Sequence, residues 1–133
     1  MRMTVGKKQS GAPSLSLGQQ GEEAAVRHLQ AHGYKILERN FRCKAGEVDI
    51  IAEEKGNLVF VEVKARSSGL FGSPAEAVTS RKQGQISKAA LCYLGDRHCG
   101  RAARFDVVCV KFTGGRPTEV EIIRDAFELA YGQ

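Results

Sequence analysis

The alternation of hydrophobic and polar residues is clearest in two segments near the middle of the chain. Residues 47–53 and 58–64 are rich in valine and isoleucine, and a short polar turn with Gly56 and Asn57 separates them. Two such segments joined by a short turn are typical of a β-hairpin. The pattern therefore predicts a hairpin at the centre of the fold.

Two other segments have the periodicity of amphipathic helices. In residues 18–32, small and apolar residues recur along one stripe, and Gly33 follows where a helix commonly ends. A second helix is expected to begin at Pro74 and to run to about Leu94. Residues 65–73 lie between the hairpin and this helix, contain two glycines and are expected to form a mobile loop.

Shorter patterns complete the predicted order of elements. Strands are expected at residues 34–39, 104–111 and 120–123, and residues 40–45 are expected to form a basic connection. A last helical turn is expected at residues 125–130. The resulting order, α-β-β-β-α-β-β, predicts an α/β fold.

Length and composition indicate one domain. The chain has 133 residues, of which 42% are hydrophobic, so it is too short for two separate cores. Residues 1–17 are poor in large apolar side chains and are expected to be a flexible basic tail, which leaves 18–133 as the domain. No apolar run approaches the roughly 18 residues of a membrane helix, and no apolar stretch of signal-peptide length opens the chain.

Charge and cysteine content restrict the function only weakly. The net charge is +5, but the tail holds three basic residues and no acid, which leaves +2 on the domain. That balance permits a nucleic-acid partner without demonstrating one. The four cysteines form no C-x-x-C pair, so they predict no zinc finger and fit a reducing cytoplasm.

The predicted hairpin brings acidic residues together. A loop of two or four residues places Asp49 opposite Glu62 and Glu47 opposite Lys64, with directly opposed Cβ atoms about 5 Å apart. Because side chains alternate between the faces of a strand, Asp49, Glu62 and Lys64 are expected to share one face. The other face is expected to be core and consists of Val48, Ile50, Val59, Val61 and Val63.

Opposed carboxylates repel each other, so such a pair usually shares a proton, meets a cation or holds a metal ion. Oxygen ligands suit a hard ion such as Mg²⁺ or Mn²⁺. Lys64 adds an ammonium that can stabilise developing negative charge, and Glu22 in the first predicted helix could lean over the pair. From spacing alone, a solvated strand face with cross-strand salt bridges remains the alternative.

The residues that follow the hairpin are mostly basic. Residues 64–88 carry five positive side chains and one negative one, as phosphate contacts require. A solvated basic helix face is the alternative. Farther along, Asp106 is expected to be structural, for instance paired with Arg104.

Five segments occur in the order and spacing of a known protein family. Together they resemble the YraN family of small bacterial proteins, which belongs to the PD-(D/E)XK nuclease superfamily and is related to archaeal Holliday-junction resolvases. The resemblance spans about residues 18–112. The segments are G-Q-Q-G-E (18–22), R-N-F-R (39–42), G-E-V-D-I-I-A (46–52), V-F-V-E-V-K-A-R (59–66) and R-F-D-V-V (104–108).

The resemblance implies a restriction-endonuclease-like core, with a mixed β-sheet of α-β-β-β-α-β order flanked by helices. It implies that Asp49 and Glu62 bind metal, that Lys64 assists the attacking water, and that Glu22, the helix acid of resolvase-like members, is a catalytic residue and a further metal ligand. The backbone carbonyl of Val63 is a further predicted ligand. The literal P-D dipeptide is absent, because a valine precedes Asp49.

The implied function is Mg²⁺- or Mn²⁺-dependent hydrolysis of DNA by an endonuclease. The resemblance leaves open which DNA structure is cut, branched DNA included, and whether RNA is accepted. A homodimer is implied by analogy with the resolvases. A non-catalytic nucleic-acid-binding module and a protein-interaction scaffold on the same fold are the alternatives. The predicted nucleic-acid contacts are Arg42, Lys44, Arg66, Arg81, Lys82 and Lys88.

Overall fold

Two helices and five strands make up the part of the chain that the computed structural model describes, which is residues 15–67, 78–97 and 102–128. Their order is the predicted α-β-β-β-α-β-β. None of these helices is long and apolar enough to cross a membrane. The elements are α2 (Leu17–Ala31), β2 (Lys35–Cys43), β3 (Gly46–Glu54), β4 (Asn57–Ser67), α3 (Ser80–Arg97), β5 (Ala103–Thr113) and β6 (Arg116–Phe127).

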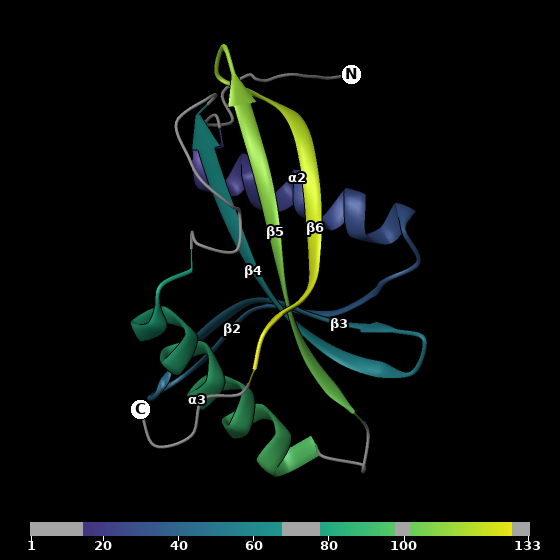
Figure 1. The fold of residues 1–133 in the computed structure, drawn as a ribbon, viewed down its shortest axis with the longest axis vertical. Helices are drawn as coiled ribbons and strands as arrows, with labels where there is room; N and C mark the ends of the chain where they lie inside the picture. The colour runs from purple at the N-terminus through teal and green to yellow at the C-terminus, as the bar shows by residue number, and fades with distance from the viewer. Residues whose placement is uncertain (1–14, 68–77, 98–101, 129–133) are drawn as a thin grey trace, which may run out of the picture.

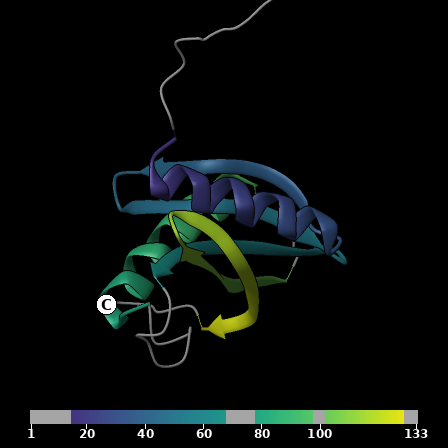
Figure 2. The same ribbon diagram turned by 90° about the horizontal axis from the view of Figure 1, so that it is seen from above.

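The strands form one mixed sheet in the order β2-β3-β4-β5-β6. Strands β4 and β5 are parallel, and the other neighbours are antiparallel. Helix α3 lies between β4 and β5 in the sequence, as a parallel connection requires. Helices α2 and α3 lie on opposite faces of the sheet (Figures 1 and 2), so the predicted mixed sheet flanked by helices is confirmed.

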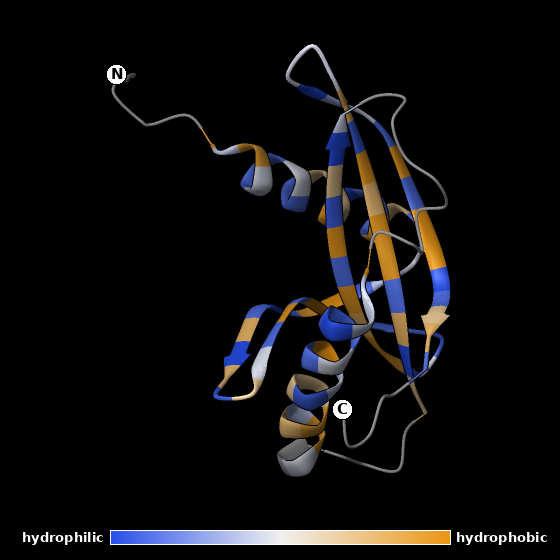
Figure 3. Ribbon diagram, turned by 60° about the vertical axis from the view of Figure 1, so that its left-hand side comes forward, coloured by the Kyte–Doolittle hydropathy of each residue, from blue (hydrophilic) through white to orange (hydrophobic). Residues whose placement is uncertain are grey.

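The core is divided into two hydrophobic clusters, one on each face of the sheet. Because the middle strands are covered on both faces, β5 is buried without interruption from Phe105 to Val110, and Figure 3 shows its middle as largely hydrophobic. The α2-side cluster includes Leu29, Ile50, Val59, Val61 and Val108. The α3-side cluster includes Val48, Phe60, Ile86, Phe105 and Val107.

The helix starts are set by capping side chains. Ser16 and Gln19 form a capping box, so α2 begins at Leu17, one residue before the predicted start of the domain. Most of the predicted tail, residues 1–14, lies outside the described residues. Helix α3 begins at Ser80, where the Thr79 hydroxyl accepts a hydrogen bond from the Lys82 N–H at 3.2 Å.

The start predicted for the second helix, Pro74, lies outside the described residues, as does most of the predicted loop at 65–73. The expectation of helix was wrong for Val78 and Thr79, which precede α3 and are not helical. The first three residues of that predicted loop still belong to β4, which ends at Ser67. The expectation of an early loop was therefore wrong for this part. Pairing with the parallel neighbour β5 explains the extension, because Arg66 and Ser67 lie in register with Lys111 and Phe112.

Two strands run farther than predicted because a polar residue in each adopts a left-handed backbone. Strand β2 continues to Cys43 through Asn40, whose φ is 54°, although a connection was expected from residue 40. Strand β6 continues to Phe127 through Asp125, also with a φ of 54°, where a helical turn was expected. Asparagine and aspartate tolerate this conformation better than most residues, so the strands bend without ending.

The central hairpin has the predicted register. Ile50 lies opposite Val61 and Glu54 opposite Asn57, and the turn consists of Lys55 and Gly56. Both turn residues have positive φ, 51° and 83°, as a two-residue hairpin turn of type I′ requires. The predicted hairpin is therefore confirmed.

One face assignment in the hairpin was wrong. Val48 packs in the α3-side cluster, whereas Ile50, two residues later, packs in the α2-side cluster. The regular alternation of side chains is thus interrupted at Asp49. On the neighbouring strand, the left-handed Asn40 lies between Arg39 and Phe41, which are the partners of Ile50 and Val48.

Candidate metal and nucleic-acid site

Asp49 lies where β3 and β4 separate. The regular pairing of the two strands extends only to Ile50 and Val61, and the next pair, Asp49 with Glu62, is not part of the ladder. Instead, Oδ2 of Asp49 accepts a hydrogen bond from the N–H of Val63 at 2.8 Å. The carboxylate therefore occupies the gap between the strands in a fixed orientation.

Glu62 lies beside Asp49 and is almost completely buried, with 5% of the residue exposed. The two side chains are within hydrogen-bonding reach. Burial, followed by repulsion from Asp49, raises the pKa of Glu62 to about 8, while Lys82 and Lys64 act in the opposite direction.

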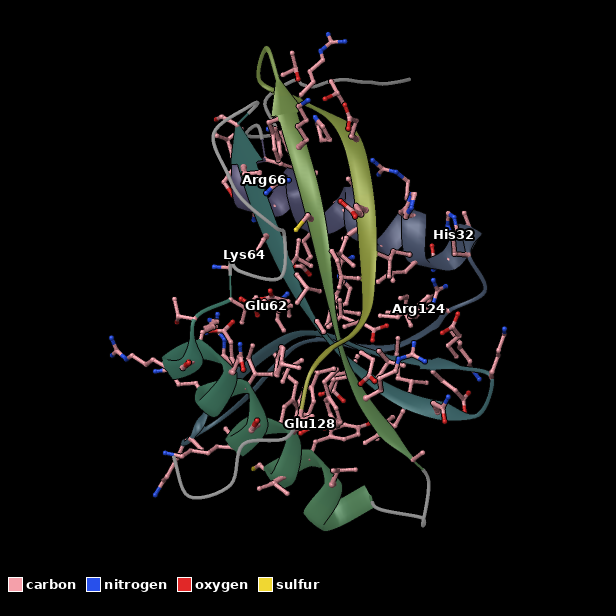
Figure 4. The ribbon with its side chains drawn as sticks, in the orientation of Figure 1. His32, Glu62, Lys64, Arg66, Arg124 and Glu128 are labelled. Carbon is pink, nitrogen blue, oxygen red and sulfur yellow. The ribbon has the colours of Figure 1, made fainter. Side chains whose placement is uncertain are left out.

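Lysines from two elements surround Glu62. Nζ of Lys82, on α3, lies 3.7 Å from Oε2 of Glu62, and Lys64 follows Glu62 by two residues along β4. Figure 4 shows Glu62, Lys64 and Arg66 following one another along β4, with α3 below. Lys82 was predicted as a nucleic-acid contact, and the structure also places it against the carboxylate pair.

The prediction that Glu47 lies opposite Lys64 was wrong. Because β3 and β4 have already separated, these residues are not paired across the ladder. Glu47 instead lies opposite Arg42 on β2, with Nε of Arg42 3.7 Å from Oε2 of Glu47. Glu47 therefore belongs to the β2–β3 hairpin rather than to the carboxylate pair.

Glu22 lies near Asp49 but has other partners. Both residues line a pocket of about 350 Å³ together with Val63 and the start of α2. Oε2 of Glu22 accepts hydrogen bonds from Arg39 at 3.0 Å and from Asn40 at 3.2 Å. The negative charge of Glu22 is therefore matched by an arginine in this arrangement.

The acidic site consists of two carboxylates rather than three. Within the described parts of the chain, no three Asp, Glu, His or Cys side chains gather closely enough to hold a metal ion. The pair still fits a Mg²⁺ site, because Mg²⁺ is commonly held by one or two carboxylates and completes its shell with water and substrate phosphate. The assignment of Glu22 as a further ligand stays a prediction, and it requires release from Arg39.

The predicted basic residues lie on the α3 side of this site. Arg42, Lys44 and Lys82 line one pocket of about 390 Å³. Arg81 and Lys88 line a second pocket of about 360 Å³, which shares Gln85 with the first. Arg66 lies farther along β4, beyond Lys64 (Figure 4).

A separate buried network confirms the structural interpretation of Asp106. Its carboxylate accepts hydrogen bonds from Arg104 at 2.8 and 2.9 Å, from the Tyr34 hydroxyl at 2.7 Å and from the Asp125 N–H at 2.9 Å. The Arg104 guanidinium also donates to Glu54 at 2.6 Å. The network holds the bend of β6 at Asp125 and leaves the Asp106 carboxylate with no exposed surface.

Glu54 and Arg124 extend this network and were not found from the sequence. Arg124 donates to both carboxylate oxygens of Glu54, at 3.3 and 3.0 Å. Hydrogen bonds from Arg124 and then from Arg104 lower the pKa of Glu54 to about 2 against the opposing effect of burial. The sequence separations, 50 to 70 residues, explain why no local pattern indicated these pairs.

The fold and site together define a small α/β protein with a carboxylate pair and a flanking basic surface. The chain belongs to the uncharacterised protein family UPF0102, whose profile matches residues 21–110. It is 56% identical to a UPF0102 protein of Geobacter metallireducens over 117 residues, which are 87% of this chain and 95% of that protein. It is 51% identical to one of Geotalea uraniireducens over 126 residues, 94% of this chain and 99% of that protein. The resemblance to the YraN family is confirmed.

Solved structures show a more distant likeness. The EndoMS–dsDNA2 complex has a TM-score of 0.42 at 20% identity and covers 82% of this chain and 42% of that chain. A repair endonuclease from Pyrococcus abyssi has a TM-score of 0.42 at 18% identity and covers 80% of this chain and 42% of that chain. We therefore infer function from the residues of this chain.

Proposed function

We propose that this protein is a metal-dependent endonuclease that hydrolyses phosphodiester bonds in DNA, branched DNA included. The observation that carries the proposal is that the buried Glu62 neighbours Asp49, whose carboxylate is held by the Val63 N–H at the point where β3 and β4 separate. Placing two acids together in a low-dielectric setting opposes stability. Such an arrangement is expected where a cation is bound during function.

Asp49 and Glu62 would hold the metal, Mg²⁺ or Mn²⁺, and the backbone carbonyl of Val63 is a further candidate ligand. Bound there, the ion would neutralise charge on a phosphate and make a water more acidic. The chain itself supplies orientation, because the Val63 N–H fixes the Asp49 carboxylate. Glu22 would bind the ion only after its salt bridge with Arg39 is broken.

Lys64 and Lys82 would supply positive charge on the α3 side of the pair. Both lie close enough to favour the ionised form of Glu62. Lys64, by resemblance to the family, is proposed to orient the attacking water and to stabilise negative charge as it develops on phosphate. Lys82 is proposed to hold Glu62 in place and to contact the DNA backbone.

A non-catalytic nucleic-acid-binding module is the second candidate. One observation favours it. Glu22 forms a salt bridge with Arg39, so the described residues offer two carboxylates for a metal where the resemblance implied three. The basic pockets beside the pair would then bind DNA without cutting it. Cleavage assays separate the two functions.

The test is metal-dependent cleavage of a panel of labelled DNA molecules by the full chain. The panel contains a four-way junction, a flap, a nicked duplex, a linear duplex and a single strand, each with Mg²⁺, Mn²⁺ or EDTA. We expect cleavage of at least one substrate only with metal, and a loss of at least about 100-fold in Glu62→Gln. Glu121→Gln makes the same chemical change at an exposed position of β6 and should cleave normally.

Two results would overturn the nuclease proposal. One is that the wild-type protein cuts no substrate with either metal. The other is that Glu62→Gln cuts as fast as the wild type. DNA binding without any cleavage would move the non-catalytic module into first place.

A further inference from the structure

A polar pocket of about 390 Å³ lies between the β2–β3 turn and the first half of α3. Arg42 at the end of β2 and Lys44 in the turn line it on one side, and α3 contributes Lys82 and Gln85. The side chain of Arg42 is 74% exposed, and Lys44 is also exposed, so both can reach a ligand. The pocket therefore presents cationic groups from two elements that are distant in the sequence.

Gly46, the first residue of β3 after the turn, allows the backbone to pack directly against α3. A Cβ atom on Gly46 would lie 2.7 Å from the backbone oxygen of Gln85, a separation that real Cβ atoms essentially never show. The backbone of β3 therefore approaches α3 more closely than any other residue would allow. This close approach places the turn beside α3, so that Lys44 on the turn and Lys82 on the helix line the same pocket.

The charge of the pocket suits an anion. Three cationic side chains face one acid, Glu47, which is itself 3.7 Å from Arg42. Lys82 also lies 3.7 Å from Glu62, so the same side chain lines the pocket and contacts the carboxylate pair. A ligand in the pocket would therefore lie next to the proposed metal site.

We infer that this pocket binds one backbone phosphate of a DNA strand. The next phosphate of the same strand would lie over Asp49 and Glu62. The inference rests on the proposed function in that its ligand is DNA. Arg81 and Lys88, in the second pocket along α3, would contact the strand farther on. Contacts of this kind fix the position of a strand without reading its sequence.

The test measures the salt dependence of DNA binding in EDTA, where no cleavage occurs. The anisotropy of a fluorescein-labelled DNA duplex reports its affinity for the full chain at sodium chloride concentrations from about 50 to 250 mM. We expect Arg42→Gln and Lys44→Gln each to lower the slope of log affinity against log salt by about 1, and the double variant by about 2.

Lys35→Gln is the matched control. Lys35 is an exposed residue at the other end of β2, eight residues from Cys43, which is about 26 Å along a strand. Its substitution should leave the slope unchanged. A slope that falls equally in Lys35→Gln and in Lys44→Gln would overturn the inference, because the effect would then come from net charge alone.

Gly46→Ala tests the pocket without removing a charge. The new methyl group must push the turn away from α3, so DNA affinity should fall several-fold while circular dichroism and the thermal midpoint report whether the protein stays folded. If the folded variant binds DNA as tightly as the wild type, the docked turn is not needed and the inference fails.

The inference and the nuclease proposal fail in different ways. Wild-type slope and affinity in the Arg42→Gln, Lys44→Gln double variant would overturn the phosphate pocket, even if the wild type cuts DNA. A slope that is reduced in that double variant but not in Lys35→Gln would support the pocket, even if no substrate is ever cut. A wild-type protein that binds no DNA would overturn the pocket outright.

Discussion

Replacing Glu62 with glutamine should make the metal-free protein more stable at neutral and alkaline pH. The pKa of Glu62 is raised from 4.5 to about 8 by burial and by repulsion from Asp49. The folded state therefore holds this proton more tightly than the unfolded state does. It follows that Glu62 reduces the stability of the wild type progressively as the pH rises from about 4.5 to about 8, and not below that range.

The size of the effect follows from the shift. Each unit of pKa difference corresponds to about 1.4 kcal/mol, so the full shift sets an upper limit of about 5 kcal/mol above pH 8. Glutamine loses the attraction of Lys82, 3.7 Å away, and its amide must still be desolvated. We therefore expect Glu62→Gln to raise the free energy of unfolding by about 2 kcal/mol at pH 8, and to have little effect at pH 4.5.

Urea unfolding in EDTA, at several pH values from 4.5 to 9, measures this difference. The wild type should lose stability across that range relative to Glu62→Gln, and the two curves should become parallel above about pH 8. Glu121→Gln, at an exposed position, should follow the wild type. Parallel curves for the wild type and Glu62→Gln at every pH, or a Glu62→Gln protein that is less stable at pH 8, would refute the reasoning.

Three further predictions concern the buried network around Asp106 and the lysine at position 64. Tyr34→Phe removes the hydrogen bond to the buried Asp106, so the free energy of unfolding in urea should fall by about 2 kcal/mol; a loss below about 0.5 kcal/mol would contradict this. Glu54 has a pKa of about 2, so its stabilisation is present above pH 4.5 and lost as the pH falls towards 2. Glu54→Gln should therefore cost about 2 kcal/mol at pH 7 and flatten the wild-type decline in acid, and an unchanged decline would be inconsistent. Lys64→Ala should abolish cleavage yet keep Mn²⁺ affinity within about threefold; loss of both together would indicate a structural role for Lys64.

The centre of the site could be predicted from the sequence because a short turn sets the register of a hairpin. The two-residue turn at Lys55 and Gly56 fixes which residues oppose each other as far as Ile50 and Val61, so that Asp49 and Glu62 are the next residues on the two strands. The separation of the strands at Asp49 could not be predicted in the same way. It depends on the Asp49 side chain taking the N–H of Val63, which no periodicity signals.

Contacts between distant segments explain the remaining differences. Glu22 forms a salt bridge with Arg39, which the sequence indicated only as part of a motif. Glu62 forms one with Lys82, which lies on a helix and follows it by 20 residues in the chain. Hydrophobic periodicity reports the buried face of an element but not its polar partner. The extension of β6 likewise depends on Asp106 holding the bend at Asp125, a contact across 19 residues.

The most direct test of the central claim, that Asp49 and Glu62 hold one divalent metal ion, is the Mn²⁺ affinity of the metal-free protein, measured by the loss of the free-ion electron paramagnetic resonance signal. Because two carboxylates without substrate phosphate make a weak site, we predict one ion bound with a Kd of about 1 mM at pH 8. Asp49→Asn and Glu62→Gln should each weaken binding at least about tenfold, and Glu121→Gln should bind as the wild type does. Equal Mn²⁺ affinity in all four proteins would contradict the assignment of these two carboxylates as the metal site.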